Sequence, residues 1–382
     1  MFFIAKNINN KIEEVFIKAF KELGLKPHGI VFLKPNLCGR PPILPGENSD
    51  PVFTKELVTF LLKNGASKVI IGHTSLLGTS DKAFPFEEVI KGGGFDIFYN
   101  MDRVEIMNLD LEKKNKERIE GAIFNIPEIV RKADFYINLA KVKTHMETTV
   151  SFSLKNQMGL LALQDRIRMH QTDLETHIAL LGKILKPHLA ILDGIVSMEG
   201  NGPHHGQPNK TNFIGFGTDM VELDSAVAYI IGFDFKAIKQ IAIAQEIGAG
   251  QYPQEENLIK YKEAVNIKKF KPADKVYKYG KNAAAYPTYS CSRCITAVNE
   301  FGHAIKKHPL KNWWFIKKAL FGRQKINIVF GKADELELDK KDKNIFIGRC
   351  SANCAQKHGQ KCLDKCPPSV KETEVFIRRY FD

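Results

Sequence analysis

Lysines and a histidine follow short apolar runs in the first half of this 382-residue chain. Lys34 begins the segment Lys-Pro-Asn-Leu, and Lys141, Lys143 and His145 belong to the segment Lys-Val-Lys-Thr-His. Ammonium groups bind carboxylates and phosphates, and histidine exchanges protons near neutral pH. We therefore predict that Lys34, Lys141, Lys143 and His145 are the catalytic residues of a site for a small anionic substrate.

Four further polar residues are assigned to substrate binding: Asn36, Lys155, Asp193 and Asp219. Lys155 adds a cation, and Asn36 follows a proline that fixes the backbone bend after Lys34. Asp193 and Asp219 each follow an apolar run. His170 is a second candidate for a proton-transferring base, and the glycine-rich loop around His204 and His205 can approach a ligand closely.

Six of the seven cysteines lie in the last quarter of the chain. Cys291 and Cys294 have two residues between them, and Cys350, Cys354, Cys362 and Cys366 follow after a gap of 55 residues. The N-terminal segment has no basic start, long apolar stretch or cleavage site typical of a secretion signal. Clustered thiols then indicate a metal site in a reducing compartment, and we expect a cytoplasmic location.

The cysteine spacing favours an iron–sulfur cluster over zinc. A zinc ribbon places two Cys-x2-Cys pairs roughly 15–20 residues apart, and this chain has only one such pair. Cys366 precedes a proline, as a cluster ligand does in ferredoxin motifs. The predicted ligands of a [4Fe-4S] cluster are Cys291, Cys294, Cys350 and Cys366, with zinc as the alternative metal. Cys354 and Cys362 are neighbours, alternative ligands or a redox pair.

The elements that position these residues alternate between strands and helices. Apolar runs predict strands at residues 30–33, 68–71, 135–139, 189–192 and 212–216, and helical periodicity predicts helices at residues 54–63, 86–91, 174–185, 222–231 and 235–246. The alternation predicts an α/β fold with a mostly parallel sheet flanked by helices, and ligands at the carboxyl ends of its strands. We expect two domains, residues 1–285 and a smaller cysteine-rich α+β domain at residues 286–382.

Several protein classes are excluded by composition and motifs. Hydrophobic residues make up 44% and charged residues 26% of the chain, as in ordinary globular proteins. No apolar run approaches the roughly 18 residues that a membrane span needs. The glycine motifs of dinucleotide-binding and P-loop proteins and the nucleophile elbow of α/β-hydrolases do not occur.

The net charge of +13 is concentrated in the C-terminal third. Residues 301–350 hold 12 basic and 5 acidic residues, and residues 255–281 hold 8 basic and 4 acidic ones. Such a surplus favours an acidic partner. An acidic electron-transfer protein suits this surface, and nucleic acid is not the partner that we expect.

Several segments occur in an order that resembles one known family. They are Lys34-Pro-Asn-Leu, Ile137-Asn-Leu-Ala-Lys-Val-Lys-Thr-His, Ser153-Leu-Lys-Asn-Gln-Met-Gly, Asp193-Gly-Ile, Glu199-Gly-Asn-Gly-Pro and Gly217-Thr-Asp-Met-Val-Glu-Leu-Asp. Together they resemble the family catalogued as domain of unknown function 362. The resemblance implies an association with iron–sulfur clusters, which many members carry in a fused ferredoxin module. The ferredoxin repeat itself does not occur in this chain.

Three functions are compatible with these residues. The first is an iron–sulfur oxidoreductase or redox-accessory protein, in which the C-terminal cluster passes electrons to the anion site. The second is a non-redox isomerase or lyase acting on a carboxylate, in which the lysines bind the anion and a histidine is the base. The third is a cluster-bearing binding module that docks an acidic partner through its basic third.

Overall fold

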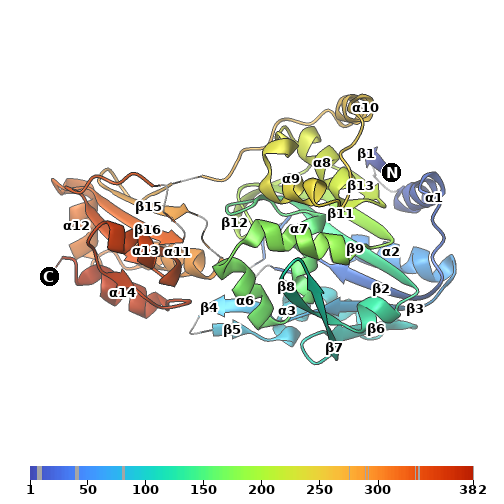
Figure 1. Ribbon diagram of the computed structural model, residues 1–382, viewed down its shortest axis with the longest axis horizontal. Coiled ribbons are helices and arrows are strands. Elements are labelled where there is room, and N and C mark those ends of the chain that lie inside the picture. The colour runs from blue at the N-terminus through green and yellow to red at the C-terminus, as the bar shows by residue number, and fades with distance from the viewer. Residues whose placement is uncertain are drawn as a thin grey trace. The chain divides into compact units, whose positions relative to one another are not determined.

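The computed structural model describes residues 1–6, 11–38, 43–79, 82–274, 276–288, 290, 292–331, 333 and 336–381. These residues divide into two compact units, Met1–Leu76 with Pro85–Ala273, and Leu77–Phe84 with Asp274–Asp382 (Figure 1). The boundary expected after residue 285 stays a prediction about independently folding domains.

A large sheet forms the centre of the first unit. Its strands are β1 (Phe2–Lys6), β2 (Gly29–Pro35), β3 (Ala66–His73), β6 (Val104–Asn108), β9 (Phe135–His145), β10 (Thr149–Val150), β11 (Leu189–Asn201), β12 (His205–Asn209) and β13 (Phe213–Gly217). Along the main path the order is β1-β13-β11-β9-β2-β3-β6. The five strands from β11 to β6 are parallel, whereas β13 and β1 are antiparallel to their neighbours.

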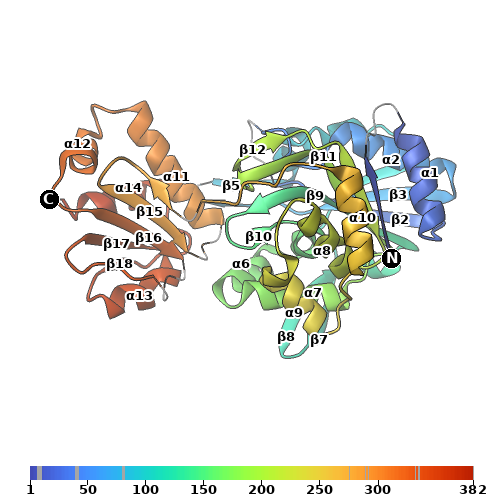
Figure 2. The same cartoon turned by 90° about the horizontal axis from the view of Figure 1, so that it is seen from above.

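Helices cover both faces of this sheet. The helices and 3-10 turns of the unit are α1 (Ile12–Glu22), α2 (Pro51–Lys63), α3 (Phe86–Gly92), η1 (Phe95–Phe98), α4 (Ile129–Lys132), α5 (Ser153–Asn156), η2 (Gln157–Leu160), α6 (Leu163–Gln171), α7 (Leu174–Ile184), α8 (Met220–Ile230), η3 (Phe235–Ala237), α9 (Lys239–Glu246) and α10 (Glu255–Val265). In Figure 2, α1 and α2 lie on one face and α7, α8 and α9 on the other. This arrangement confirms the predicted α/β fold.

The alternation of side chains along the strands explains the two layers. Phe16 of α1 packs against Phe53 of α2 and Phe216 of β13, with ring centroids 5.6 and 6.3 Å apart. On the other face, Phe32 of β2 packs against Tyr136 of β9. Both faces of a central parallel strand are buried, so such strands read as continuous apolar runs, which is why the sequence located them.

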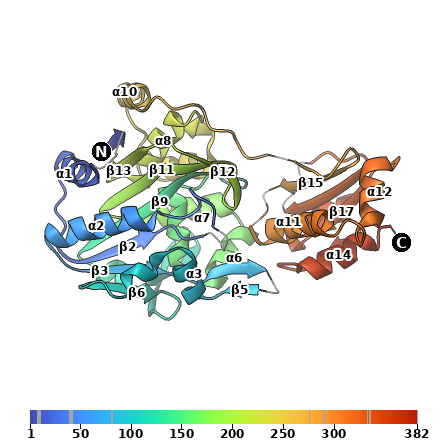
Figure 3. The same ribbon diagram turned by 180° about the vertical axis from the view of Figure 1, so that it is seen from behind.

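The second unit has a smaller sheet in the order β14-β15-β16-β17-β18. These strands are β14 (Tyr277–Lys278), β15 (Ala283–Thr288), β16 (Ile326–Gly331), β17 (Lys343–Ile347) and β18 (Cys362–Leu363). The four from β15 to β18 run parallel. The helical segments are α11 (Ser292–Lys307), α12 (Trp313–Phe321), η4 (Arg349–Ser351), α13 (Ala352–Lys357) and α14 (Val370–Arg378), and α11 lies beside α14 (Figure 3).

Two two-stranded sheets complete the described elements: β4 (Leu76–Thr79) with β5 (Lys82–Phe84), and β7 (Lys114–Ile119) with β8 (Ala122–Pro127). Within the described part of the chain, no helix has both the length and the apolar character that crossing a membrane requires.

Candidate functional site

Lys34 is buried at the carboxyl end of β2. Its side chain is 1% exposed, and its ammonium donates a hydrogen bond to the Pro35 carbonyl at 2.6 Å. A Cβ atom on Gly159 would lie 2.8 Å from Lys34 Nζ, so the glycine in η2 makes room for this lysine. Burial, and secondarily the charge of Arg166, lower the pKa of Lys34 to about 7. Lys34 is therefore partly an uncharged amine at neutral pH.

His73 ends the neighbouring strand β3. It is 2% exposed, and its Nδ1 atom lies 2.6 Å from the Thr74 carbonyl, to which it donates. Burial, and then the charge of Lys34, hold the pKa of His73 well below its usual range. The imidazole is thus neutral beside Lys34. No role was predicted for His73 from the sequence, although, like Lys34, it lies at the end of a buried apolar run.

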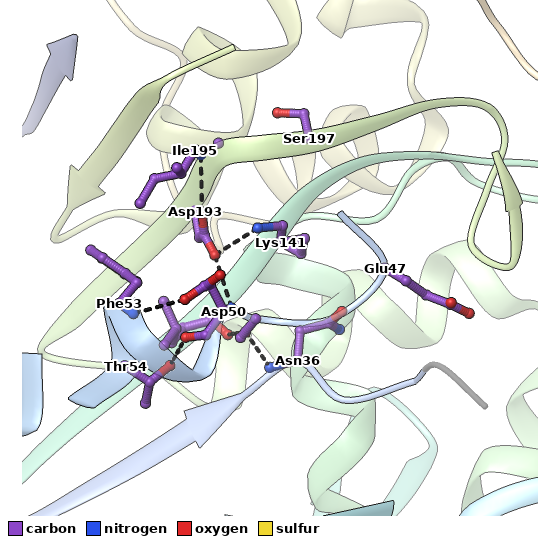
Figure 4. Close-up of polar contacts among 12 residues, drawn as sticks. Asn36, Glu47, Asp50, Phe53, Thr54, Lys141, Asp193, Ile195 and Ser197 are labelled. Carbon is purple, nitrogen blue, oxygen red and sulfur yellow. Dashed lines mark hydrogen bonds and ion pairs between the residues drawn. The ribbon is translucent and has the colours of Figure 1, made fainter. Parts of the chain in front are cut away.

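Lys141 and Asp193 form a buried ion pair between β9 and β11. Lys141 Nζ and Asp193 Oδ2 are 2.7 Å apart, and both side chains are at most 2% exposed. Asp193 also accepts hydrogen bonds from the backbone N–H groups of Asp50, at the start of α2, and of Ile195 (Figure 4). Asp193 therefore balances the charge of Lys141 and connects β9, β11 and α2.

Lys143 lies two residues further along β9 and has three acceptors. Its ammonium donates to Asn36 Oδ1 at 2.7 Å, to the Glu47 carbonyl at 2.7 Å and to Cys38 Sγ at 2.8 Å. An ammonium has three N–H donors, so these contacts use all of them. Cys38, to which the sequence analysis assigned no role, is thus a member of the cluster.

Asn36 belongs to a chain of hydrogen-bonded side-chain amides that contacts Lys143. Asn36 Nδ2 donates to Asn156 Oδ1 at 2.9 Å, and Asn156 Nδ2 donates to Asn138 Oδ1 at 2.7 Å. All three residues are buried. Asn36 therefore fixes the loop after β2 against β9 and α5 and orients its own oxygen toward Lys143.

His145 ends β9 as a neutral ring. Its Nδ1 accepts hydrogen bonds from the N–H groups of Glu147 and Thr148, at 3.1 and 3.3 Å. Burial, and then the charge of Lys155, hold its pKa well below the usual range. Because Nδ1 is an acceptor, the proton of the neutral ring lies on Nε2. His145 is therefore arranged to donate a hydrogen bond from Nε2.

Among the described residues, Lys155 differs from the other lysines of the cluster in having no acceptor. The side chain is half-buried, and among the described residues nothing accepts a hydrogen bond or forms an ion pair with its ammonium. Burial lowers its pKa, against a smaller raising effect of Glu147. The charges that act on Lys155 include Lys143 and Cys38, which also act on Lys34. Lys34, Cys38, Lys143 and Lys155 therefore form one cluster.

Asp224 of α8 positions Lys155 through the backbone of α5. The carboxylate accepts hydrogen bonds from Ser153 N at 3.0 Å, from Ser153 Oγ at 2.5 Å and from Leu154 N at 2.9 Å. These are groups at the start of α5, directly before Lys155. Burial raises the pKa of Asp224 to about 7. From the sequence, Asp224 was interpreted as ordinary punctuation of the predicted helix at residues 222–231 and was given no role in the site.

Three histidines named from the sequence have different surroundings. His170 Nδ1 lies 3.2 Å from Glu147 Oε2, and His204 Nδ1 lies 2.5 Å from Glu47 Oε1. His205, next in the chain, is exposed on the β11–β12 hairpin. A Cβ on Gly202 in this hairpin would lie 2.1 Å from the Thr144 carbonyl, so the glycine lets the hairpin reach the end of β9.

The structure does not bring Asp219 to this cluster. The sequence analysis treated the run at residues 212–216 like the other strands, but β13 is antiparallel to β11. The carboxyl end of β13 therefore lies at the opposite edge of the sheet. There Asp219 is the N-cap of α8 and accepts hydrogen bonds from Val221 N and Glu222 N at 2.8 and 3.1 Å.

In the second unit, several thiols border one turn between β17 and η4. Cys294 Sγ lies 3.0 Å from the position of a Cβ on Gly348. Cys350 and Cys366 both act electrostatically on Arg349. Cys362 donates to the Gly348 carbonyl at 3.4 Å. The predicted ligand Cys291 lies outside the described residues.

Cys354 points elsewhere. Its thiol donates to the Ala333 carbonyl at 3.3 Å, and its side chain packs in a small core with Val329 and Phe346. Within the described residues, no three histidine, cysteine, aspartate or glutamate side chains are grouped so as to hold a metal ion. The described thiols therefore share a neighbourhood without forming a ligand set among themselves.

Comparison with known proteins gives one family. A curated relative, Thylakoid-associated protein sll1697 of Synechocystis sp., is 32% identical over 127 residues, which are 30% of this chain and 38% of the relative. The chain thus matches less than half of that protein's length. A solved structure, the lactate racemase apoprotein of Thermoanaerobacterium thermosaccharolyticum, matches with a TM-score of 0.36 and 12% identity, over 58% of this chain and 55% of that chain. The family model described as Domain of unknown function (DUF362) matches residues 31–229, just over half of the chain. The chain therefore belongs to the DUF362 family.

Proposed function

We propose that the first unit binds a small organic anion beside Lys155 and transfers a proton to or from it. The observation that carries this proposal is the ammonium of Lys155, which is half-buried and has no acceptor among the described residues. Placing a charge in a desolvated position without a partner costs free energy. A carboxylate or phosphate bound there would supply the missing acceptor.

The neighbouring groups suit proton transfer. Lys34, with a pKa of about 7, is a base at neutral pH, and His145 presents a protonated Nε2. In the proposed step, Lys34 takes the proton from the carbon next to a bound carboxylate. The C–H electron pair moves into the carboxylate, and the charge of Lys155 stabilises the resulting enediolate. A proton delivered by water to the opposite face of that carbon, with loss of the Lys34 proton to solvent, gives the mirror-image centre. Loss of a leaving group from the next carbon, with its electron pair, gives a lyase reaction instead.

The binding step is tested by calorimetric titration with inorganic phosphate and with 2-hydroxy and 2-amino carboxylates of two to four carbons. We expect one of these anions to bind, and the Lys155→Met variant to bind it at least ~10-fold more weakly, since a hydrogen bond to a charged group contributes about 1.5–3 kcal/mol. Lys55→Met, an exposed lysine of α2, is the matched control. Equal affinity of wild type and Lys155→Met would refute the site.

The proton-transfer step has a separate readout. A bound carboxylate should exchange its α-hydrogen for deuterium in D2O. Proton NMR measures this exchange as loss of the α-hydrogen signal. The exchange rate should rise with pH and level off above an apparent pKa of about 7, because only neutral Lys34 accepts a proton. Binding without exchange would leave an anion-binding protein and contradict the proton transfer.

A second function, an iron–sulfur oxidoreductase, is supported by the thiols around Gly348. Cys294, Cys350 and Cys366 border this turn and, with Cys291, are the predicted ligands. Binding a cluster would have to draw these thiols closer together, because no three of the described side chains are grouped to hold a metal ion. Thiolates are the donors that such clusters use, and a bound cluster supplies one-electron transfer.

This second proposal is tested by anaerobic purification with iron and sulfide analysis and by electron paramagnetic resonance after reduction. Single Cys294→Ser, Cys350→Ser and Cys366→Ser variants should lose the cluster absorbance. Cys354→Ser is the matched control, because its thiol faces the Ala333 carbonyl instead. Full zinc occupancy without iron, or iron loss only in Cys354→Ser, would contradict the assignment.

A further inference from the structure

Large apolar side chains are exposed along α12 and the turn before it. The exposed fractions are 91% for Leu310, 72% for Phe321, 51% for Trp313 and 43% for Leu320. Leu320 and Phe321 follow Trp313 by seven and eight residues, which places all three on one side of a helix. We name Leu310, Trp313, Leu320 and Phe321 the apolar stripe.

The opposite side of α12 anchors the helix to its own unit. Phe315 and Ala319 are 1% exposed, and the ring of Phe315 packs against Phe301 of α11 and Phe381 near the C-terminus. Asn312, just before the helix, donates to the Ala304 and His308 carbonyls, each at 3.0 Å. α12 lies beside the C-terminus in all three views (Figures 1 to 3). The apolar stripe therefore faces outward on a helix whose other side is fixed.

The surroundings of the apolar stripe are cationic. Residues 301–333 contain no aspartate or glutamate. The exposed cations of this segment are Lys306, Lys307, Lys311, Lys317, Lys318, Arg323 and Lys325. Two of them, Lys317 and Lys318, lie within α12 itself. An apolar stripe flanked along the chain by cations fits a partner that is apolar beneath an anionic surface.

We propose that α12 and the turn before it bind the surface of a membrane that contains anionic lipids. The leucine, phenylalanine and tryptophan side chains enter the boundary between headgroups and acyl chains, and the lysines contact the lipid phosphates. Nucleic acid fits less well, because leucines have no aromatic face on which bases stack. A second copy of this chain would bring its own lysines against these and be repelled.

Tryptophan fluorescence tests the proposal directly, because the chain has two tryptophans, both at this site. Trp314 is half-buried against Phe315 and Phe381, so a Trp314→Phe variant leaves Trp313 as the sole reporter. With vesicles of phosphatidylcholine containing 30% phosphatidylglycerol, its emission should shift to shorter wavelength. Vesicles of phosphatidylcholine alone should give at least ~10-fold weaker binding, since the lysines then lack their attraction.

Two double variants separate the apolar and the charged contributions in vesicle sedimentation. Leu310→Ser with Phe321→Ser should reduce binding at least ~10-fold, since both side chains are mostly exposed in the free protein. Lys317→Glu with Lys318→Glu should reduce it at least as much and remove most of its salt dependence. Leu111→Ser, 85% exposed in the first unit, and Lys371→Glu, exposed on α14, are the matched controls.

Three outcomes would overturn the proposal. The first is no blue shift of Trp313 with anionic vesicles. The second is equal vesicle binding by the stripe variant and its controls. The third is binding to single-stranded DNA or RNA that depends on the apolar stripe and exceeds binding to anionic vesicles, which would assign this surface to nucleic acid. Circular dichroism of every variant checks that the fold is retained.

Discussion

Two groups of lysines at one sheet edge differ in how their charges are compensated. Lys141 and Lys143, on β9, have an aspartate or a full set of three acceptors within 2.8 Å. Lys34 has one carbonyl acceptor, and Lys155 has none among the described residues. The pKa values of these last two lysines are lowered. The difference separates lysines that are compensated within the fold from the two lysines to which the proposed function assigns a ligand and a proton.

The largest expected effect is on the compensated group. Lys141→Met should lower the free energy of unfolding by about 3–5 kcal/mol, because it leaves the buried carboxylate of Asp193 without its cation. Urea denaturation measures this loss. Lys63→Met, which breaks an exposed pair with Glu13 on the surface, should cost only about 0–1 kcal/mol. Similar losses for both variants would mean that Lys141 is not a structural cation.

The pH dependence of stability should identify Lys34. Its pKa is about 7 in the folded protein against an ordinary 10.5, so between these values the unfolded chain binds the extra proton. Stability therefore rises with pH through this window, by at most about 1.4 kcal/mol per pH unit. This rise should be absent from Lys34→Met. Urea denaturation from pH 7 to 10 measures it as the difference in the free energy of unfolding between wild type and Lys34→Met. Parallel curves would show that Lys34 is not desolvated.

Lys155→Met should change the free energy of unfolding by less than about 1 kcal/mol, or raise it, because no hydrogen bond is lost and a desolvated charge is removed. This result, beside the loss for Lys141→Met, would sharpen the distinction between the two groups. A loss of several kcal/mol in Lys155→Met would place it instead with the structural lysines.

The smallest difference between two paired variants is expected at Cys38. In Cys38→Ser the hydroxyl still accepts a hydrogen bond from Lys143, so the loss in stability should stay below about 1 kcal/mol. Cys38→Val keeps the volume but removes the acceptor, and should cost about 1–3 kcal/mol. The pair of variants measures, by thermal or urea unfolding, whether Lys143 needs all three of its acceptors. Equal losses would show that it does not.

The sequence determined the parallel core of the first unit. The runs at residues 30–33, 68–71, 135–139 and 189–192 lie within β2, β3, β9 and β11, because strands buried on both faces must be apolar without interruption. The strand at residues 212–216 also exists, but its direction could not be read from its residues. Direction depends on the path of the chain between strands, so Asp219 was assigned to the wrong edge.

The direction of the strands and the packing of distant segments also explain which residues of the cluster were predicted from the sequence and which were not. Lys34 lies near the carboxyl end of β2, and Lys141, Lys143 and His145 lie in the last half of β9, which continues beyond the apolar run at residues 135–139. Their type and spacing were enough to place them at one edge. Asp224 and Cys38 come from a helix and a loop whose approach to that edge is set by packing over long sequence separations. Their role as partners of α5 and of Lys143 was therefore visible only in three dimensions.

Residue type and spacing by themselves established a mostly parallel α/β sheet, a polar edge rich in lysine and a C-terminal group of cysteines. Which lysine is neutralised and which is left without an acceptor was decided by the tertiary structure alone. The reason is physical: compensation depends on whether an oxygen or sulfur atom from a distant segment lies within about 3 Å of the ammonium. No local pattern encodes that distance, and it is what distinguishes Lys141 from Lys155.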